Sequence, residues 1–337
     1  MKILITGGAG FIGFHLTKKI FEKRKDVEIT GIDNLNNYYD VNLKKDRLEV
    51  LKQFDKYNFI KLDLTEKESL DRLFDSQSFD IVINLAAQAG VRYSITNPYA
   101  YLDSNLVGFL NILEACRNYP VKHLLYASSS SVYGGNSKVP YSADDNVDHP
   151  VSLYAATKKA NELMAHAYSN LYDIPTTGLR FFTVIGPYGR PDMAYFSFTN
   201  DIVNGKKIKV FNHGKMKRDF TYVDDVVSAV EKLIDEIPNS QKDWNEVEGK
   251  VSESWAPYKV YNIGNNHPET LMDFISLLEK HLGIEADKEF LDMQAGDVVK
   301  TYADMSDLEK DLNFKPSTSL DKGLRLFVDW YKNYYGI

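Results

Sequence analysis

Cysteine, a basic excess and long apolar runs are all missing from this 337-residue chain. A single cysteine excludes an intrachain disulfide framework and a structural zinc site built on cysteines. Forty Lys and Arg residues face 47 Asp and Glu residues, and the net charge of −7 argues against a nucleic-acid partner. No apolar run approaches the roughly 20 residues that span a bilayer, which argues against a membrane protein.

The seven histidines form no ligand pattern, so we expect no metal. Together these absences predict a soluble protein of a reducing compartment, the cytoplasm. The 44% of hydrophobic residues are enough for a full-sized core, and the length predicts about two domains.

Short β-branched runs alternate with helical patterns along the first half of the chain. The runs that read as buried strands are residues 2–6, 27–33, 58–63, 80–86, 123–128, 176–182 and 259–264. Strands that alternate with helices of this length predict an α/β protein, with a Rossmann-type doubly wound parallel sheet.

From about residue 182 the alternation weakens, and residues 205–218 carry six basic side chains but no acidic one. We therefore predict a nucleotide-binding domain over residues 1–181, to which 219–265 return. A smaller, discontinuous substrate lobe is expected over 182–218 and 266–337.

Three glycines follow the first strand and open the first helix. Gly7, Gly10 and Gly13 form G-x-x-G-x-x-G, which permits a tight turn and brings the helix N-terminus close to a pyrophosphate. Asp33 ends the second strand twenty residues after Gly13. An acid there accepts hydrogen bonds from a ribose and repels a 2′-phosphate, so the pattern predicts NAD rather than NADP.

Tyr154 and Lys158 lie four residues apart, which places a phenol and an ammonium on one face of a helix. A nearby positive charge favours the phenolate and so makes Tyr154 a candidate base. Two Tyr-x-x-x-Lys matches occur, but Tyr57 and Lys61 lie in a strand pattern. A serine cluster that contains Ser129 lies 25 residues before Tyr154.

Ser, Tyr and Lys in this order behind this glycine turn resemble the extended short-chain dehydrogenase/reductase superfamily and its NAD-dependent epimerase/dehydratase family. The resemblance covers essentially the whole chain, through TGGAGFIG, NLAAQAGVRYS, SSSSVYG, YAATK, LRFFTVIGPYGRP, KRDFTYVDD and QAGDV. It implies Ser129, Tyr154 and Lys158 as catalytic residues. It also implies an NAD site made of Gly7, Gly10, Phe11, Ile12, Gly13, Asp33, Asn34, Asp63, Leu64, Leu85, Ala87, Gln88, Asn105, Tyr154, Lys158 and Phe181.

The residues after Ser129 separate the reactions of this family. Dehydratases place an Asp-Glu pair there, and UDP-glucuronate decarboxylases keep a Glu just before Val-Tyr-Gly. This chain has Ser130 and Ser131 instead, so it departs from both patterns. A 4-epimerase, which needs no elimination step, fits the site.

The segments around 183–193, 33–44 and 294–320 resemble bacterial and plant UDP-glucuronate 4-epimerases. The resemblance implies conversion of UDP-glucuronate to UDP-galacturonate through a transient 4-keto sugar. Arg190 can donate two hydrogen bonds to the C6 carboxylate, and Thr183 can donate one from its hydroxyl. The alternative interpretation of Arg190 is a solvated charge on a loop, with no functional role. The other expected substrate contacts are Arg92, Ser129, Arg218 and Asp297.

Three alternatives stay open at this point. One is a UDP-glucuronate decarboxylase, against which the missing Glu argues. Another is a 4-epimerase of UDP-glucose or UDP-N-acetylglucosamine. A non-enzymatic NAD-responsive regulator is least supported, because both Tyr154 and Lys158 are present. The resemblance also implies a homodimer through helices near 101–117 and 154–171.

Overall fold

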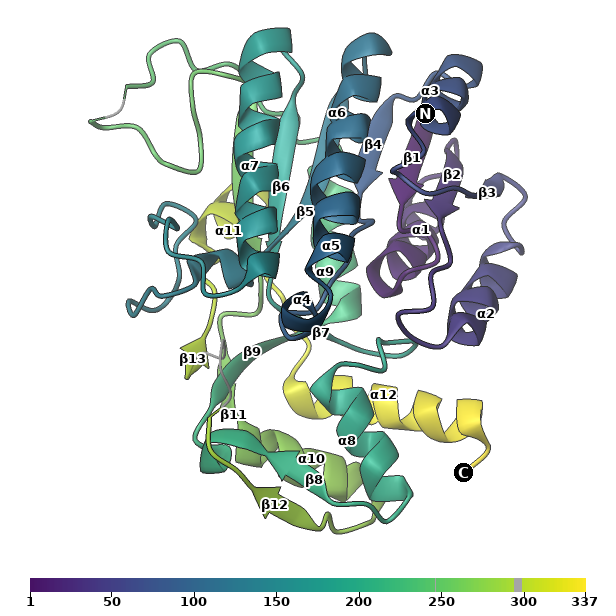
Figure 1. Cartoon of the computed structure of the whole chain (residues 1–337), viewed down its shortest axis with the longest axis vertical. Helices are drawn as coiled ribbons and strands as arrows, with labels where there is room; N and C mark the ends of the chain where they lie inside the picture. The colour runs from purple at the N-terminus through teal and green to yellow at the C-terminus, as the bar shows by residue number, and fades with distance from the viewer. Residues whose placement is uncertain (246, 294–298) are drawn as a thin grey trace.

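In the computed structural model, residues 1–245, 247–293 and 299–337 are described. A parallel sheet of seven strands forms the upper part of the molecule in Figure 1, in the order β10-β6-β5-β4-β1-β2-β3. Its strands are β1 (Lys2–Thr6), β2 (Glu28–Asp33), β3 (Tyr57–Lys61), β4 (Ile81–Asn84), β5 (His123–Ser129), β6 (Thr176–Phe181) and β10 (Tyr258–Ile263). The predicted doubly wound α/β fold is confirmed.

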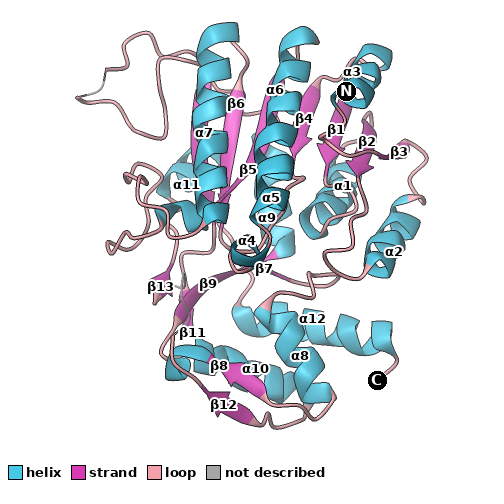
Figure 2. Cartoon of the chain, in the orientation of Figure 1, coloured by secondary structure: helices cyan, strands magenta, loops and turns pink. Residues whose placement is uncertain are grey.

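Helices cover both faces of this sheet (Figure 2). On one face α3 packs on α6 and α6 on α7, while on the other α9 packs between α1 and α11. The helices around the sheet are α1 (Phe11–Lys23), α2 (Val41–Leu51), α3 (Lys67–Ser76), α4 (Tyr93–Thr96), α5 (Pro98–Tyr101), the π-helix η1 (Leu102–Val107), α6 (Gly108–Asn118), the 3₁₀ turn η2 (Ser130–Tyr133), α7 (Leu153–Tyr172), α9 (Val223–Leu233) and α11 (Ser306–Leu312).

The central strands are mostly buried because both faces of the sheet are covered by helices. Ile3, Leu4 and Ile5 of β1 are fully buried, and they face two separate apolar clusters, one on each side of the sheet. A third cluster holds the lower part of the molecule together and includes Phe274 and Phe327. The sheet is therefore the middle layer of three.

The lower part in Figure 1 combines short strands with three longer helices. Strand β9 pairs with β7, β11 and β13, and β8 pairs with β12. The elements are β7 (Thr183–Ile185), α8 (Ala194–Val203), β8 (Ile208–Val210), η3 (Phe211–Gly214), β9 (Lys217–Tyr222), β11 (Pro268–Thr270), α10 (Leu271–Leu282), β12 (Lys288–Phe290), β13 (Lys300–Thr301) and α12 (Leu320–Tyr335).

Strand β10 belongs to the large sheet although its sequence follows elements of the lower part. The division into 1–181 with 219–265, and 182–218 with 266–337, stays a prediction. No helix within the described ranges is long and apolar enough to cross a membrane.

Candidate active site

A cavity of about 440 Å³ opens at the carboxyl ends of the sheet strands, next to the point where the strand order reverses between β1 and β4. Ligand sites of doubly wound sheets lie at this position, because the connections there diverge to opposite faces. The cavity wall includes the turn after β1, the end of β2, the loop after β4 and the end of β5. Its volume suits a small-molecule ligand.

The turn after β1 needs glycine at two positions for steric reasons. Gly7 has a φ of +68°, and a Cβ there would lie 2.9 Å from the backbone nitrogen of Ala86. A Cβ on Gly13 would lie 2.3 Å from the carbonyl oxygen of Gly7. Helix α1 begins at Phe11 without a side-chain cap, so its first N–H groups face the cavity as donors for an anion.

Asp33 ends β2 in the wall of the cavity and is buried. Its Oδ1 accepts a hydrogen bond of 2.8 Å from the backbone nitrogen of Leu35 and lies 3.8 Å from Nζ of Lys44. Burial lowers the pKa of Lys44, against the opposing charge of Asp33. Lys44 lines the same wall and was not predicted, because it lies on α2, eleven residues further along the chain.

Asn34 and Asp63 meet beside Asp33. Nδ2 of Asn34 donates to Oδ2 of Asp63 at 2.7 Å, and the other oxygen of Asp63 accepts from the backbone and hydroxyl of Thr65. Burial opposes ionisation of Asp63, but these hydrogen bonds outweigh it and lower its pKa. Both residues line the cavity, so two neighbouring strands contribute polar groups to one end of it.

Asn105 does not line the cavity but fixes a loop that does. Its Oδ1 accepts from the backbone nitrogen of Gln88 at 2.8 Å, and its Nδ2 donates to the carbonyl oxygen of Gln88 at 3.1 Å and to Oγ1 of Thr157 at 3.0 Å. Asn105 lies in the π-helix η1, and such turns are common at functional sites. The residue therefore positions Gln88 from behind.

The three predicted catalytic residues come together at the end of β5. Ser129 is the last residue of that strand, and its Oγ accepts from the backbone nitrogen of Ser131 at 3.2 Å and from the hydroxyl of Ser131 at 2.9 Å. Tyr154 and Lys158 lie in the first two turns of α7. All three line the cavity, and Nζ of Lys158 donates to the carbonyl oxygen of Ala127 at 2.9 Å.

Burial acts on both ionisable groups of this set. It raises the pKa of the Tyr154 phenol, while a side-chain hydrogen bond with Ser129 and the charge of Arg190 act in the opposite direction. It lowers the pKa of Lys158 to about 8, opposed by the charge of Glu162. Lys158 is thus mostly charged at pH 7. The pKa of Tyr154 depends on its burial, on the hydrogen bond with Ser129 and on the charge of Arg190.

Three of the predicted substrate residues line the same cavity from the lower part. They are Thr183 on β7, Arg190 in the loop before α8, and Arg218 on β9. Arg190 is paired with Asp192, from Nε to Oδ1 at 3.0 Å and from Nη2 to Oδ2 at 2.5 Å. Nη1 of Arg218 donates to the carbonyl oxygens of Lys217 and Val299.

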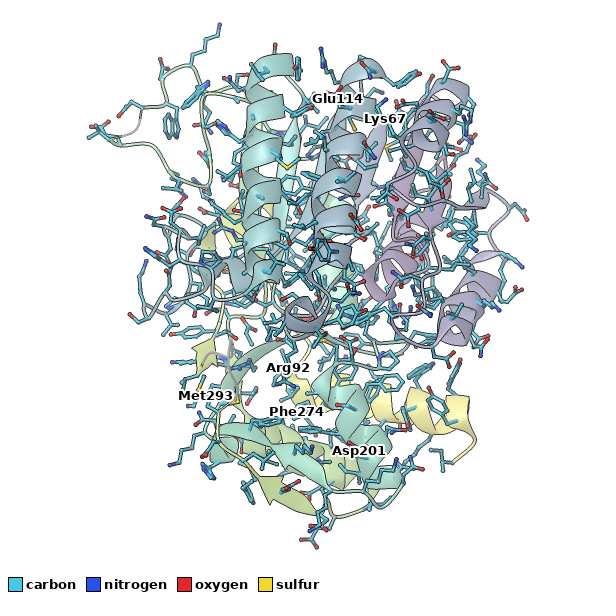
Figure 3. All side chains as sticks on the ribbon, in the orientation of Figure 1. Lys67, Arg92, Glu114, Asp201, Phe274 and Met293 are labelled. Atoms are coloured by element: carbon cyan, nitrogen blue, oxygen red, sulfur yellow. The ribbon has the colours of Figure 1, made fainter. Side chains whose placement is uncertain are left out.

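Of the other two predicted substrate contacts, only Arg92 lies in the part of the chain that the structure describes. Arg92 is exposed and is not among the described residues of the cavity wall; its guanidinium lies 5.2 Å from the centre of the Phe211 ring, at the junction with the lower part (Figure 3). Asp297 lies outside the described residues. The remaining predicted cofactor contacts all line the cavity: Gly10, Phe11, Ile12, Leu64, Leu85, Ala87 and Phe181.

Residues 3–264 match the NAD dependent epimerase/dehydratase family. The chain belongs to this family. It is an epimerase-type isomerase, and NAD is its cofactor. The cavity fits that cofactor, because the glycine turn leaves space that a Cβ would fill, and Asp33 offers acceptors at the end of β2.

Individual relatives match this chain over nearly its full length. The chain is 55% identical to Protein CapI of Staphylococcus aureus, with 99% of each chain covered. It is 45% identical to a probable UDP-glucuronate 4-epimerase of Rhizobium meliloti, over 99% of this chain and 98% of that one. Among solved structures, a UDP-glucuronic acid 4-epimerase from Bacillus cereus, in complex with UDP-glucuronic acid and NAD, superimposes with a TM-score of 0.86 at 32% identity, covering 99% and 100% of the two chains.

Proposed function

We propose that this family member interconverts UDP-glucuronate and UDP-galacturonate by epimerisation at C4. The observation that carries the proposal is the guanidinium of Arg190 in the wall that also holds Ser129, Tyr154 and Thr183. A carboxylate on the sugar is the natural partner for such a fork. Relatives of 44–45% identity named UDP-glucuronate 4-epimerase support this substrate.

Tyr154 is the residue that moves the proton of the sugar 4-hydroxyl. The hydrogen bond with Ser129 and the charge of Arg190 favour the phenolate of Tyr154. Lys158 lies one helical turn further along α7. Bound NAD supplies the reversible acceptor for hydrogen at C4. Because Ser131 holds Oγ of Ser129 with two hydrogen bonds, the serine hydroxyl is oriented before the sugar arrives.

Charged groups from the lower part hold the rest of the substrate. In this proposal Arg190 and Thr183 bind the C6 carboxylate, and Arg218 reaches the diphosphate. Holding the carboxylate out of alignment with a 4-keto group suppresses loss of carbon dioxide from the intermediate. Arg92 and Asp297 stay predictions as nucleotide-sugar contacts.

A decarboxylase is the competing reaction at the same substrate. It would use an acid beside Ser129, where this chain has Ser130 and Ser131. We expect purified protein to convert UDP-glucuronate into a product of unchanged mass. In NMR, the coupling constants of the sugar H4 should change from those of an axial proton to those of an equatorial proton. Loss of carbon dioxide would identify a decarboxylase, and conversion of UDP-glucose alone would identify an epimerase of neutral sugars.

The homodimer is also proposed rather than established. Helices α6 and α7 expose apolar side chains, with Leu110 40%, Leu163 60% and Leu171 65% exposed. A second copy packed on these two helices would bury them. Sedimentation of the protein with Leu163→Lys and of the unmodified protein tests this, because the charge would separate such a dimer.

A further inference from the structure

The loop between β7 and α8 contains an ion pair, Arg190–Asp192, and the proposed chemistry gives a role only to the arginine. Both carboxylate oxygens of Asp192 accept hydrogen bonds from Arg190, Oδ1 from Nε at 3.0 Å and Oδ2 from Nη2 at 2.5 Å. The side chains are only 23% and 27% exposed, so the pair is largely withdrawn from water. Bidentate pairs of this kind are stronger and more directional than a surface salt bridge between flexible chains.

A tyrosine from a distant loop holds the carboxylate in turn. The hydroxyl of Tyr38 donates to Oδ2 of Asp192 at 3.1 Å. Tyr38 lies after β2 and its ring packs against Tyr93 with centroids 4.9 Å apart. A Cβ on Gly90 would lie 2.6 Å from the same hydroxyl. Three loops around the cavity, after β2, β4 and β7, thus converge on Asp192 and Arg190.

The planar geometry of the guanidinium determines which N–H groups of Arg190 remain available to a ligand after Asp192 has bound. Asp192 uses Nε and one hydrogen of Nη2, which form one edge of the planar group. The adjacent edge consists of Nη1 and the second hydrogen of Nη2. Because the group is planar, fixing one edge also fixes the direction of the other. Arg190 lines the cavity, so that second edge is the one a ligand carboxylate can take.

From this geometry we propose that Asp192 is a positioning residue that determines substrate specificity, by holding Arg190 so that its second edge receives the sugar carboxylate. The proposal rests on the proposed function, since it requires a carboxylated sugar. Tyr38 supports Asp192 in this role.

Two effects favour the arrangement over a free arginine. An arginine without a partner samples many rotamers, and ordering it on binding costs affinity, whereas Asp192 orders it beforehand. Asp192 also occupies the edge formed by Nε and Nη2, so a second carboxylate is accepted only end-on, at the remaining edge. The orientation of the sugar carboxylate is thereby restricted. A neutral sugar has no carboxylate, so it gains nothing from this arrangement of Arg190.

The test compares Asp192→Asn with the unmodified full-length protein in the presence of NAD. The amide keeps the size of the side chain but replaces one acceptor by a donor, which breaks one of the two bonds. We expect the KM and the calorimetric Kd for UDP-glucuronate to rise about tenfold, with kcat changed less than about threefold. Binding of UDP-glucose should change less than about twofold. Tyr38→Phe should shift the same values in the same direction by a smaller factor.

Asp201→Asn is the matched control, because Asp201 lies on α8 in the lower part (Figure 3) and outside the cavity wall. Equal losses for both sugars in Asp192→Asn would indicate a purely structural role and overturn the proposal. Tighter binding of UDP-glucuronate would overturn it as well, since Asp192 would then compete with the substrate. If the unmodified protein binds both sugars equally, the proposed function itself fails; a preference for UDP-glucuronate that Asp192→Asn retains overturns only the role of Asp192.

Discussion

The ammonium of Lys158 donates a hydrogen bond of 2.9 Å to the carbonyl oxygen of Ala127. Ala127 lies in β5 two residues before Ser129, and Lys158 lies on α7 one turn after Tyr154. This bond therefore connects the helix that carries Tyr154, the proposed base, with the strand that carries Ser129. It holds the two elements in register at the reacting end of the cavity.

Replacing the base tests the assignment of Tyr154. We expect Tyr154→Phe to lower kcat by about 10²–10⁴-fold, which is the usual contribution of a positioned acid–base group. NAD binding should be kept, because only the hydroxyl is removed. Turnover can be followed by NMR, with Tyr99→Phe as a control at a tyrosine that is 74% exposed. Undiminished turnover would exclude Tyr154 as the base.

Removing the cationic fork tests the carboxylate site. We expect Arg190→Ala to weaken UDP-glucuronate binding about 100-fold, since a charge-assisted bidentate contact is lost and each 1.4 kcal/mol corresponds to about tenfold in affinity. Affinity for NAD should stay the same. Calorimetry with both ligands measures this, with the exposed Arg72→Ala as control. Equal weakening of NAD and sugar binding would point to a collapsed loop instead.

The acid at the end of β2 is expected to select the cofactor. Asp33→Asn should lower the affinity for NAD by about tenfold and raise the relative affinity for NADP. The reason is that the repulsion of a 2′-phosphate disappears, while the positive charge of Lys44, whose Nζ lies 3.8 Å from Oδ1 of Asp33, is kept. Fluorescence titration with both cofactors compares the variant with Asp55→Asn, an exposed acid in the turn before β3. An unchanged cofactor preference would contradict the role of Asp33.

A comparison of two glycines with similar φ angles distinguishes the effect of steric crowding from that of backbone strain. Gly7 (φ +68°) would place a Cβ 2.9 Å from Ala86, whereas Gly205 (φ +65°) has no atom within 4 Å of such a Cβ. Gly205→Ala should cost about 1–2 kcal/mol of unfolding free energy, from the left-handed conformation alone. Gly7→Ala should cost more and also weaken NAD binding at least about tenfold. Denaturant titration and cofactor binding together test this; equal effects in both variants would mean that crowding at the turn is unimportant.

A buried histidine makes the stability depend on pH. Burial lowers the pKa of His123 to about 4, against a backbone hydrogen bond with Ile234. An unfolded histidine titrates near 6.5, so between these values the unfolded chain binds a proton that the folded protein excludes. The free energy of unfolding should therefore fall as the pH drops from 6.5 towards 4, by about 2 kcal/mol from this residue at pH 5.

Urea titrations at pH 7 and pH 5 measure this difference. His123→Gln cannot take up the proton, and its amide can still bond Oγ1 of Thr177, which His123 contacts at 2.8 Å. The difference between the two pH values should shrink in the variant by the same amount. An identical pH dependence in both proteins would show that His123 does not contribute.

Much of the sheet could be predicted because local patterns determine it. The strands 2–6 and 123–129, for example, are largely buried, and the apolar residues Ile3, Leu4, Ile5, Leu124 and Leu125 mark them in the sequence. The glycine turn, Asp33 and the Tyr154–Lys158 pair were also visible in the sequence, because each follows a characteristic spacing, and the family resemblance added Ser129. Their positions in one cavity follow from the parallel sheet, whose strands all end at the same edge.

Other features depend on residues that are far apart in the chain. Asn105 was expected to line the cavity, but the π-helix turns it onto Gln88. Arg92 stacks on Phe211 across the junction instead of lining the cavity wall. The support of Arg190 by Asp192 and Tyr38, which brings together residues more than 150 positions apart, had no local signal.

By itself, the sequence determined the doubly wound fold and the glycine turn with its acid. These depend on periodicity and steric demands within a few residues, which local sequence encodes. Only the tertiary structure decided that Tyr38 contacts the Asp192 carboxylate that pairs with Arg190, that Lys44 lies beside Asp33, and that Lys158 holds α7 to β5. Such relationships arise where separate loops meet, and their free energy comes from packing and hydrogen bonds that no single segment contains.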